Sequence, residues 1–208
     1  MANRLSTGVE VLDRELNGGL PAGSVVAYQA PPTSQGEVLL YELTRPRPTL
    51  YLTTDRTEDA VADAFRDTAA PTGTPDIRYV SGEDPLDAVR RAFRSAAENT
   101  SVIVDPIDGL ERTERGRYET VLNELSNHMA NTESIAVLHC LAGDHPPKLR
   151  ETTQHMADVI LDLQTDIKSG QIETRMAVTK FRGGRAPSET IKLDLSERVR
   201  VDTSRDIA

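Results

Sequence analysis

The sequence lacks any apolar run long enough to cross a membrane, because a transmembrane helix needs about 20 consecutive apolar residues. Its apolar segments are short and alternate with charged stretches. Residues 2–6 are polar and do not resemble the apolar core of a secretory signal peptide. We therefore expect a cytoplasmic protein with no membrane partner.

Cysteine, lysine and aromatic residues are also scarce. The one cysteine, Cys140, excludes an internal disulfide and fits a reducing compartment. Its segment, SIAVLHC, predicts a buried thiol. The four lysines stand against twenty arginines among 24 basic residues, and 33 acidic residues bring the net charge to −9.

An acidic, lysine-poor composition keeps a protein soluble in a cytosol rich in salt, and we interpret it as haloarchaeal. Salt at such concentrations also screens the attraction between basic residues and nucleic acid. The acidity therefore argues only weakly against DNA as a partner.

Short apolar segments alternate with amphipathic ones, which is typical of a parallel sheet with crossover helices. Strands are predicted at 25–28, 49–53, 77–80, 102–104, 135–140, 159–163, 175–179 and 191–195. Helices are predicted at 9–16, 36–44, 58–68 with an N-cap at Thr57, 85–98, 115–131 and 149–155. The last two strands alternate in polarity, which predicts an antiparallel ribbon at the sheet edge. We expect one α/β domain over 1–200 and a polar tail over 201–208.

Residues 24–43, SVVAYQAPPTSQGEVLLYEL, contain the strand and the helix that flank a phosphate-binding loop, but not the residues of the loop itself. Such a loop reads G-x-x-x-x-G-K-[ST], whereas this chain has APPTSQGE. The chain can be aligned with this motif in two registers. Glu37 occupies the position of the hydroxyl residue in one and the position of the lysine in the other, so a carboxylate replaces a group that should contact phosphate. We interpret six residues as a vestigial nucleotide-binding loop: Ala30, Thr33, Ser34, Gln35, Gly36 and Glu37.

Six segments, taken in order, carry a resemblance to one known family. They are LSTGVEVLDRELNGGLPAGSVV before the loop, YLTTDRTED, TSVIVDPIDGL, SIAVLHC, HMADVILDL and VTKFRGGRAPSETIKLDL. Together they resemble the KaiC/RadA-like branch of the RecA superfamily, in which the third is the Walker B strand and the last is a closing hairpin with a K-x-R-G signature. The resemblance implies a RecA-like P-loop NTPase core, a mostly parallel twisted sheet flanked by helices with a C-terminal antiparallel hairpin.

The resemblance also implies roles for four residues, each of which has a structural alternative. In that family, the residue at the position of Asp105 orients water on the magnesium ion that bridges the phosphates. An aspartate after a buried strand can also cap a turn. Asp55 matches a glutamate that polarises the attacking water, although its carboxylate is one methylene shorter. Alternatively, Asp55 and its neighbour Arg56 are ordinary residues at the end of a strand. Lys180 and Arg182 match a pair that reaches the terminal phosphate of the neighbouring subunit, or they pair with surface acids of their own hairpin.

Three functions follow as alternatives. The altered loop favours a pseudo-ATPase with a regulatory or scaffold role, which binds ATP and magnesium weakly or not at all and has itself or a RadA/KaiC-like paralogue as partner. A slow ATPase would instead use Ser34 and Gln35 for phosphate and Arg185 for charge. A DNA-recombination accessory protein would use the basic residues of loops 111–117 and 142–154, namely Arg112, Arg115, Arg117, Lys148 and Arg150.

Overall fold

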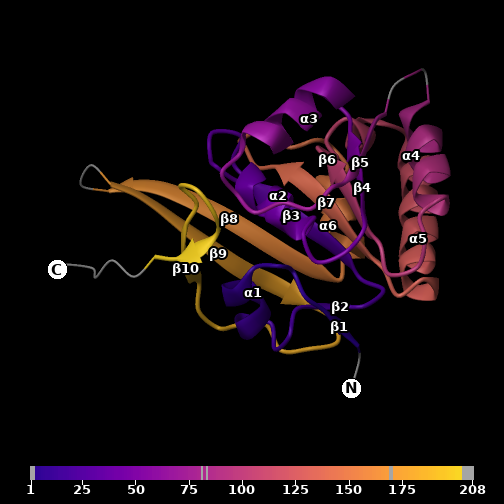
Figure 1. Cartoon of the computed structure of the whole chain (residues 1–208). Coiled ribbons are helices and arrows are strands. Elements are labelled where there is room, and N and C mark those ends of the chain that lie inside the picture. Colours follow the sequence, from indigo (N-terminus) through magenta and orange to yellow (C-terminus); the bar gives the residue numbers. More distant parts are fainter. Residues whose placement is uncertain (1–2, 81, 83, 169–170, 203–208) are drawn as a thin grey trace.

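The computed structural model describes residues 3–80, 82, 84–168 and 171–202, and nine strands within these ranges form one twisted sheet (Figure 1). The strands of this sheet are β3 (Val25–Ala30), β4 (Thr49–Thr53), β5 (Asp76–Tyr79), β6 (Ser101–Asp105), β7 (Ile135–Leu141), β8 (Val159–Lys168), β9 (Gln171–Phe181), β10 (Ile191–Asp194) and β11 (Arg200–Val201). Their order is β11-β10-β9-β8-β3-β7-β6-β4-β5. The strands from β8 to β5 are parallel, and β9, β10 and β11 continue the sheet antiparallel.

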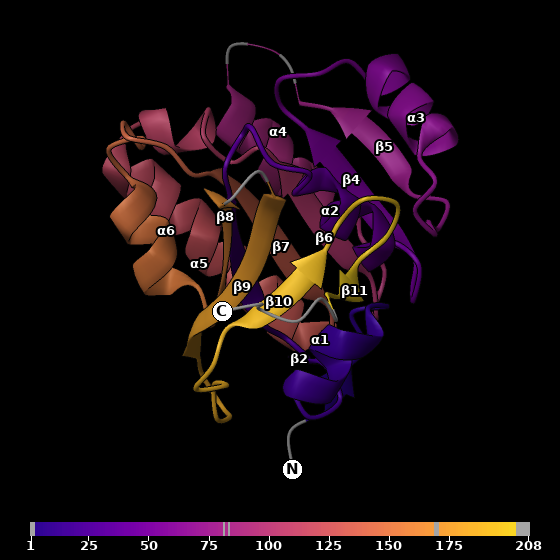
Figure 2. The same cartoon turned by 90° about the vertical axis from the view of Figure 1, so that its left-hand side faces the viewer.

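Helices cover both faces of the sheet. The helices α4 (Pro85–Arg94), α5 (Arg115–Asn131) and α6 (Arg150–Met156) pack on one face, and Figure 2 shows α6 beside α5. On the other face lie α1 (Glu10–Glu15), α2 (Glu37–Leu43) and α3 (Glu58–Asp67). None of the helices in the described ranges is long and apolar enough to span a bilayer.

The continuous apolar runs of the central strands follow from this two-sided cover, because successive side chains point to opposite faces. In β3, Val25 and Ala27 face α5, whereas Val26 and Tyr28 face α1 and α2. Cys140 near the end of β7 is fully buried, as predicted, and burial raises the pKa of its thiol. The two faces give the domain two apolar layers that share one sheet.

The α/β fold predicted from the sequence is confirmed, including the antiparallel C-terminal strands. The helix at 115–131 has the predicted bounds, and Thr57 caps α3 by accepting a hydrogen bond from the N–H of Ala60 at 3.3 Å. The sheet continues beyond the predicted ribbon, since β11 rather than β10 forms the edge and ends at Val201, one residue into the predicted tail.

The last long strands differ most from the prediction. β8 and β9 extend well beyond 159–163 and 175–179 and form a hairpin that projects from the body of the sheet (Figure 1). The outer half of this hairpin is mostly polar, and Gln164, Asp166, Ile167, Gln171 and Ile172 are exposed. Its polarity hid these residues from a reading based on apolar runs. The short strands β1 (Arg4–Leu5) and β2 (Leu20–Pro21) and the 3-10 turn η1 (Leu110–Arg112) were also not predicted.

The N-terminal turn is held together by one carboxylate. Asp13 of α1 accepts hydrogen bonds from the hydroxyl of Ser6 and from both the N–H and the hydroxyl of Thr7. The chain then returns so that β1 and β2 pair antiparallel, with Leu5 opposite Leu20. The segments LSTGVEVLD and GGLP thus have a structural role, because they form the turn before α1 and the pair of strands β1 and β2.

Gly19 makes that return possible, and its replacement by alanine should destabilise the fold. Its φ is +111°, and a Cβ would lie 2.2 Å from the carbonyl oxygen of Leu5. We expect Gly19→Ala to lower the free energy of unfolding by at least about 2 kcal/mol, measured by denaturant titration. Gly109→Ala is the control, because a Cβ there meets no atom within 4 Å. Equal stability of the two variants would contradict this account.

Candidate functional site

Four neighbouring parallel strands end at the same edge of the sheet and bring four polar side chains together. β3 leads into Glu37 at the start of α2, β4 leads into Arg56, β6 ends at Asp105, and β7 carries His139. A cavity of about 220 Å³ opens there, lined by Ala30, Pro31, Pro32, Ser34, Gly36, Glu37, Asp55, Arg56, Asp105, Pro106, His139 and Leu141. In open α/β sheets, the carboxyl ends of the strands are where ligands bind.

Arg56 connects the two carboxylates of this cavity. Its Nη1 lies 3.1 Å from Oε2 of Glu37, and its Nη2 lies 3.0 Å from Oδ2 of Asp105. The buried hydroxyl of Thr53 accepts a hydrogen bond from the Arg56 N–H, which places the arginine at the mouth of the cavity. Burial lowers the pKa of Arg56, but the two carboxylates outweigh burial and raise it above its ordinary value.

Asp105 is enclosed by donors on both oxygens. Besides Arg56, Oδ2 accepts a hydrogen bond from the hydroxyl of Tyr51, and Oδ1 contacts Nδ1 of His139. The ring of His139 stacks on Tyr28, with the ring centroids 5.4 Å apart. Burial opposes ionisation of Asp105, yet the contacts with His139, Tyr51 and Arg56 hold its pKa below the ordinary value. Asp105 is therefore a buried carboxylate stabilised by its own chain.

The loop between β3 and α2 is closed upon itself. The Ser34 hydroxyl donates to the carbonyl of Pro31 at 2.7 Å and accepts from the N–H of Gly36 at 3.2 Å. Tyr28 donates its hydroxyl hydrogen to the carbonyl of Gly36 at 2.9 Å. A Cβ at Gly36 would lie 2.7 Å from the Cβ of Ala30. No lysine side chain can therefore be added at position 36 without displacing the loop.

The predicted loop residues divide between two cavities. Ala30, Ser34, Gly36 and Glu37 line the cavity with Arg56 and Asp105. Thr33 and Gln35 point the other way and, together with Ser34, line a larger cavity of about 700 Å³ beside the β8–β9 hairpin. Asp55 reaches the first cavity but is exposed, and it accepts a hydrogen bond from the hydroxyl of Thr54 at 3.3 Å.

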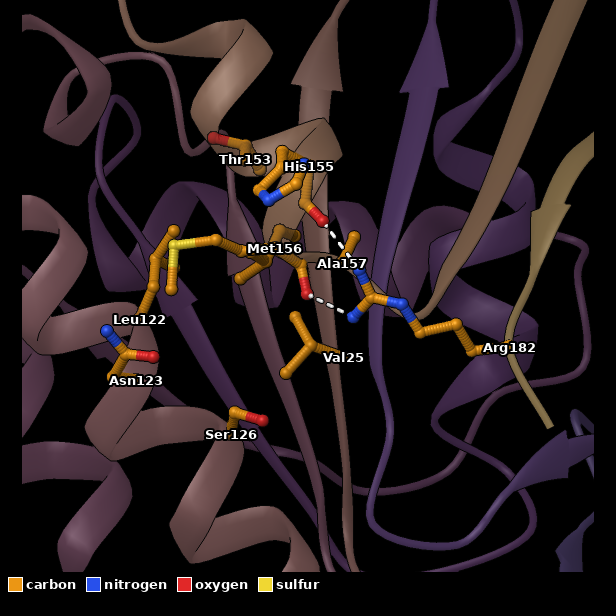
Figure 3. A pocket seen from close by; sticks show the side chains of 10 residues that line it. Val25, Leu122, Asn123, Ser126, Thr153, His155, Met156, Ala157 and Arg182 are labelled. Carbon is orange, nitrogen blue, oxygen red and sulfur yellow. Dashed lines mark hydrogen bonds between the residues drawn. The ribbon is translucent and has the colours of Figure 1, made fainter.

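Lys180 and Arg182 lie elsewhere, at the C-terminal end of α6. Lys180 Nζ donates to the carbonyl oxygens of Gln154 and His155, both at 2.8 Å. Arg182 donates to the carbonyls of His155 and Met156 (Figure 3). It also pairs with Asp158 at 3.1 Å. Cations placed there complement the free carbonyls of a helix end. Within one chain, this pair does not line the cavity of Asp105.

Arg182 borders a further cavity of about 230 Å³, where Leu122, Asn123 and Ser126 of α5 face Met156 across from Val25 (Figure 3). Its guanidinium points toward the helix end and is already engaged there. This cavity therefore has a mixed polar and apolar lining, and the guanidinium at its border is already engaged.

A second buried ion-pair network lies behind the site, and the sequence reading did not detect it. Arg150 of α6 places Nε 2.9 Å from Oε2 of Glu111 and Nη2 2.9 Å from Oδ1 of Asp108. Glu111 is fully buried and also accepts from the hydroxyl of Thr153. This network fastens η1 to α6, so Arg150 has a structural role here.

Arg56 was not predicted to be a functional residue, but the structure places it at the centre of the site. A signal was present in the chain: the carboxylate of Glu37 stands where a cation or a hydroxyl was expected, and a cation, Arg56, follows Asp55. Read together, the two exchanges indicate an ion pair. His139, which contacts Asp105, lies in the segment SIAVLHC, one of the six that carry the resemblance.

The site predicts a specific acid response. Because the pKa of Asp105 is depressed in the folded state, its ionisation stabilises the protein above the unfolded pKa, near 4, and this stabilisation is lost as pH falls through the folded pKa. We expect Asp105→Asn to lower the free energy of unfolding by about 2 kcal/mol at neutral pH. The difference from wild type should shrink as the pH falls from about 5 toward 2.

Denaturant titrations across that pH range measure the effect, with Asp76→Asn as the control. Asp76 pairs with Arg78 on the surface, where an ion pair contributes less than about 1 kcal/mol. A stability difference for Asp105→Asn that does not vary with pH would be inconsistent with a depressed pKa.

Comparisons with known proteins agree with this architecture. A family model described as "Family of unknown function (DUF7125)" matches residues 4–208, and the chain belongs to that family. Among solved structures, the chain is similar to a KaiC-like protein, PH0186, from the hyperthermophilic archaeon Pyrococcus horikoshii OT3, with a TM-score of 0.72 and 14% sequence identity. The match covers 96% of this chain and 100% of the other, and it shows a KaiC-like RecA fold. No curated protein matched the chain.

Proposed function

We propose that this member of the DUF7125 family is a RecA/KaiC-like pseudo-ATPase, which has lost hydrolysis and acts in a regulatory or scaffold role. One observation carries the proposal: Arg56 bridges Glu37 and Asp105 across the cavity where the resemblance expects phosphate and magnesium. The positions that should bind a ligand instead bind one another.

The charges of the site are exchanged relative to the expected pattern. A phosphate loop supplies a lysine to the phosphates, but this loop supplies Glu37. The cation comes from the end of β4 as Arg56 and is already neutralised by two carboxylates. Losing a charge-assisted contact with phosphate costs about 2–3 kcal/mol, or roughly two decades in affinity. Glu37 adds repulsion to that loss, which supports the absence of efficient hydrolysis.

The residues present also do not fit magnesium. A magnesium ion is bound through carboxylates and water at near-octahedral geometry. Here one oxygen of Asp105 receives Tyr51 and Arg56, and the other contacts His139. The guanidinium of Arg56 lies 3.0 Å from the carboxylate of Asp105 and would repel a divalent cation bound there. Asp105 would have to release partners before it could orient metal-bound water.

The first test is turnover. We expect the wild-type protein to release phosphate from ATP with magnesium no faster than Asp105→Asn, measured in molar potassium chloride over hours. Both rates should equal the rate without protein, because neither variant holds a metal beside an activated phosphate. Steady turnover that Asp105→Asn or Lys180→Ala abolishes would overturn the proposal.

The second test asks whether the ion pair excludes phosphate. Glu37→Ala removes a carboxylate from the cavity and frees one edge of the Arg56 guanidinium. We expect this variant to bind tripolyphosphate at least about tenfold more tightly than wild type, measured by calorimetry. The matched control is Glu151→Ala, an exposed glutamate on α6. Equal affinities of wild type and Glu37→Ala for tripolyphosphate would show that Glu37 does not exclude phosphate from the cavity.

One observation favours the alternative of a slow ATP-binding and hydrolysing enzyme with a non-standard loop. Ser34 and Arg56 line the same cavity, so a phosphate that displaced Glu37 would meet a hydroxyl and a guanidinium. Gln35 and Arg185 do not join them, because Gln35 faces the larger cavity and Arg185 lines another one beside α1. The turnover measurement decides between the two.

The alternative of a DNA-recombination accessory protein has less support. Arg150 is engaged with Glu111, Arg115 with Glu119, and Arg117 with Asp84. Few cations of these loops are thus left for phosphates of DNA. Arg150 instead joins α6 to η1, and Arg117 joins α5 to the N-cap of α4.

The proposed partner is a second copy of the chain or a RadA/KaiC-like paralogue, within a cytoplasm rich in salt. A nearly complete set of RecA-like elements around an altered loop supports this role, because a protein that has lost hydrolysis can keep the surfaces through which its subunits associate. Lys180 and Arg182 would have to leave the end of α6 to reach a neighbour. The mass of the particle in high salt, with and without ATP, reports on assembly and on its dependence on nucleotide.

A further inference from the structure

A second charged cavity, of about 290 Å³, lies at the opposite end of α2 from Arg56. Four arginines from three separate segments line it: Arg14 of α1, Arg45 just after α2, and Arg198 and Arg200 from the turn into β11. We refer to this space as the arginine cavity. It is lined further by Gly8, Glu10, Val11, Glu42, Pro71, Val199 and Val201.

Two of these arginines differ from most others in the chain. Arg90 and Arg91 pair with Asp87, and Arg94 pairs with Glu124. Within the described ranges, by contrast, no ion pair or hydrogen bond involves the guanidinium of Arg198 or Arg200. Both side chains are exposed at the mouth of the cavity. Unpaired cations that gather at one place are unexpected in a chain of net charge −9.

The carboxylates of the cavity do not neutralise it. Glu42 is only 3% exposed, and its Oε1 accepts a hydrogen bond from the N–H of Val199. Burial raises the pKa of Glu42 even though Arg45, Arg198 and Arg200 act to lower it. The lining holds four guanidinium groups and the carboxylates of Glu10 and Glu42, and Arg14 also pairs with its neighbour Glu15 at 3.5 Å, so one positive charge is left in excess.

We propose that the arginine cavity is a binding site for a small phosphate-bearing molecule, with Arg198 and Arg200 as its principal ligands. A phosphate monoester or a pyrophosphate brings the negative charge that the lining lacks. Guanidinium groups present planar, paired donors that match phosphate oxygens, and they retain these hydrogen bonds where salt screens longer-range attraction. The volume lies at the lower end of the range for ligand cavities, about 300–1,000 Å³, and suits a small compound.

This site is independent of the Arg56 cavity. The two lie at opposite ends of α2, which spans seven residues, or about 10 Å. Glu37 belongs to the N-terminal end of the helix and Glu42 to its C-terminal part. A ligand in the arginine cavity would contact the turn that joins β10 to β11, and it would not touch Asp105.

The test is a calorimetric titration of the full chain with pyrophosphate, in potassium chloride at a concentration that keeps the protein folded. We expect wild type to bind and the double variant Arg198→Ala/Arg200→Ala to bind at least about tenfold more weakly, since it loses two charge-assisted contacts. The matched control is Arg91→Ala/Arg94→Ala on α4, where both arginines lie in surface ion pairs. The control should bind as wild type does.

A second variant separates binding from folding. Arg198→Lys/Arg200→Lys keeps both charges but loses the paired donors, so its affinity should fall between those of wild type and the alanine variant. Circular dichroism checks that each variant is folded. The proposal is overturned if wild type does not bind pyrophosphate, if the alanine variant binds as tightly as wild type, or if malonate, a dicarboxylate, binds as tightly as pyrophosphate.

Discussion

The contact of Arg56 with Glu37 and Asp105 is the constraint on which the candidate site depends. It joins the start of α2 to the ends of β4 and β6, three segments that are distant in sequence. Without the guanidinium, two carboxylates would face each other across a small cavity, and one of them is almost fully buried. A buried carboxylate that loses its partner is costly. The closed loop and the lowered pKa of Asp105 are both consistent with this ion pair.

The same physical rule explains the second network, in which Arg150 joins Glu111 and Asp108 behind the first. Both networks place an arginine between two acids at the carboxyl edge of the sheet, where a ligand could otherwise bind. An acidic chain needs cations at its buried carboxylates, and arginine offers several donors for each one. The arginine cavity departs from this rule, because within the described residues neither Arg198 nor Arg200 forms an ion pair, and the buried Glu42 accepts a hydrogen bond from the N–H of Val199 instead.

The fold and the proposed function stand on different grounds. A KaiC-like RecA fold is shown by the sheet order and by a solved structure of low sequence identity. A fold of this kind carries many activities, so function has to be argued from the site. The proposal that hydrolysis is lost rests on the positions of Glu37 at the start of α2 and of Arg56 after β4. The cavity at the far end of α2 would give such a protein a ligand of its own.

The sequence by itself determined the elements, because apolar periodicity, the cap at Thr57 and the strand segments around Val102 and Val137 are local signals. It also showed that Glu37 stands where a cation or a hydroxyl was expected. Only the tertiary structure decided that Arg56 forms an ion pair with Glu37, and that Arg198 and Arg200 line the same cavity as Arg45. These contacts join residues that are far apart in the chain, and charge has no periodicity from which such pairings could be read.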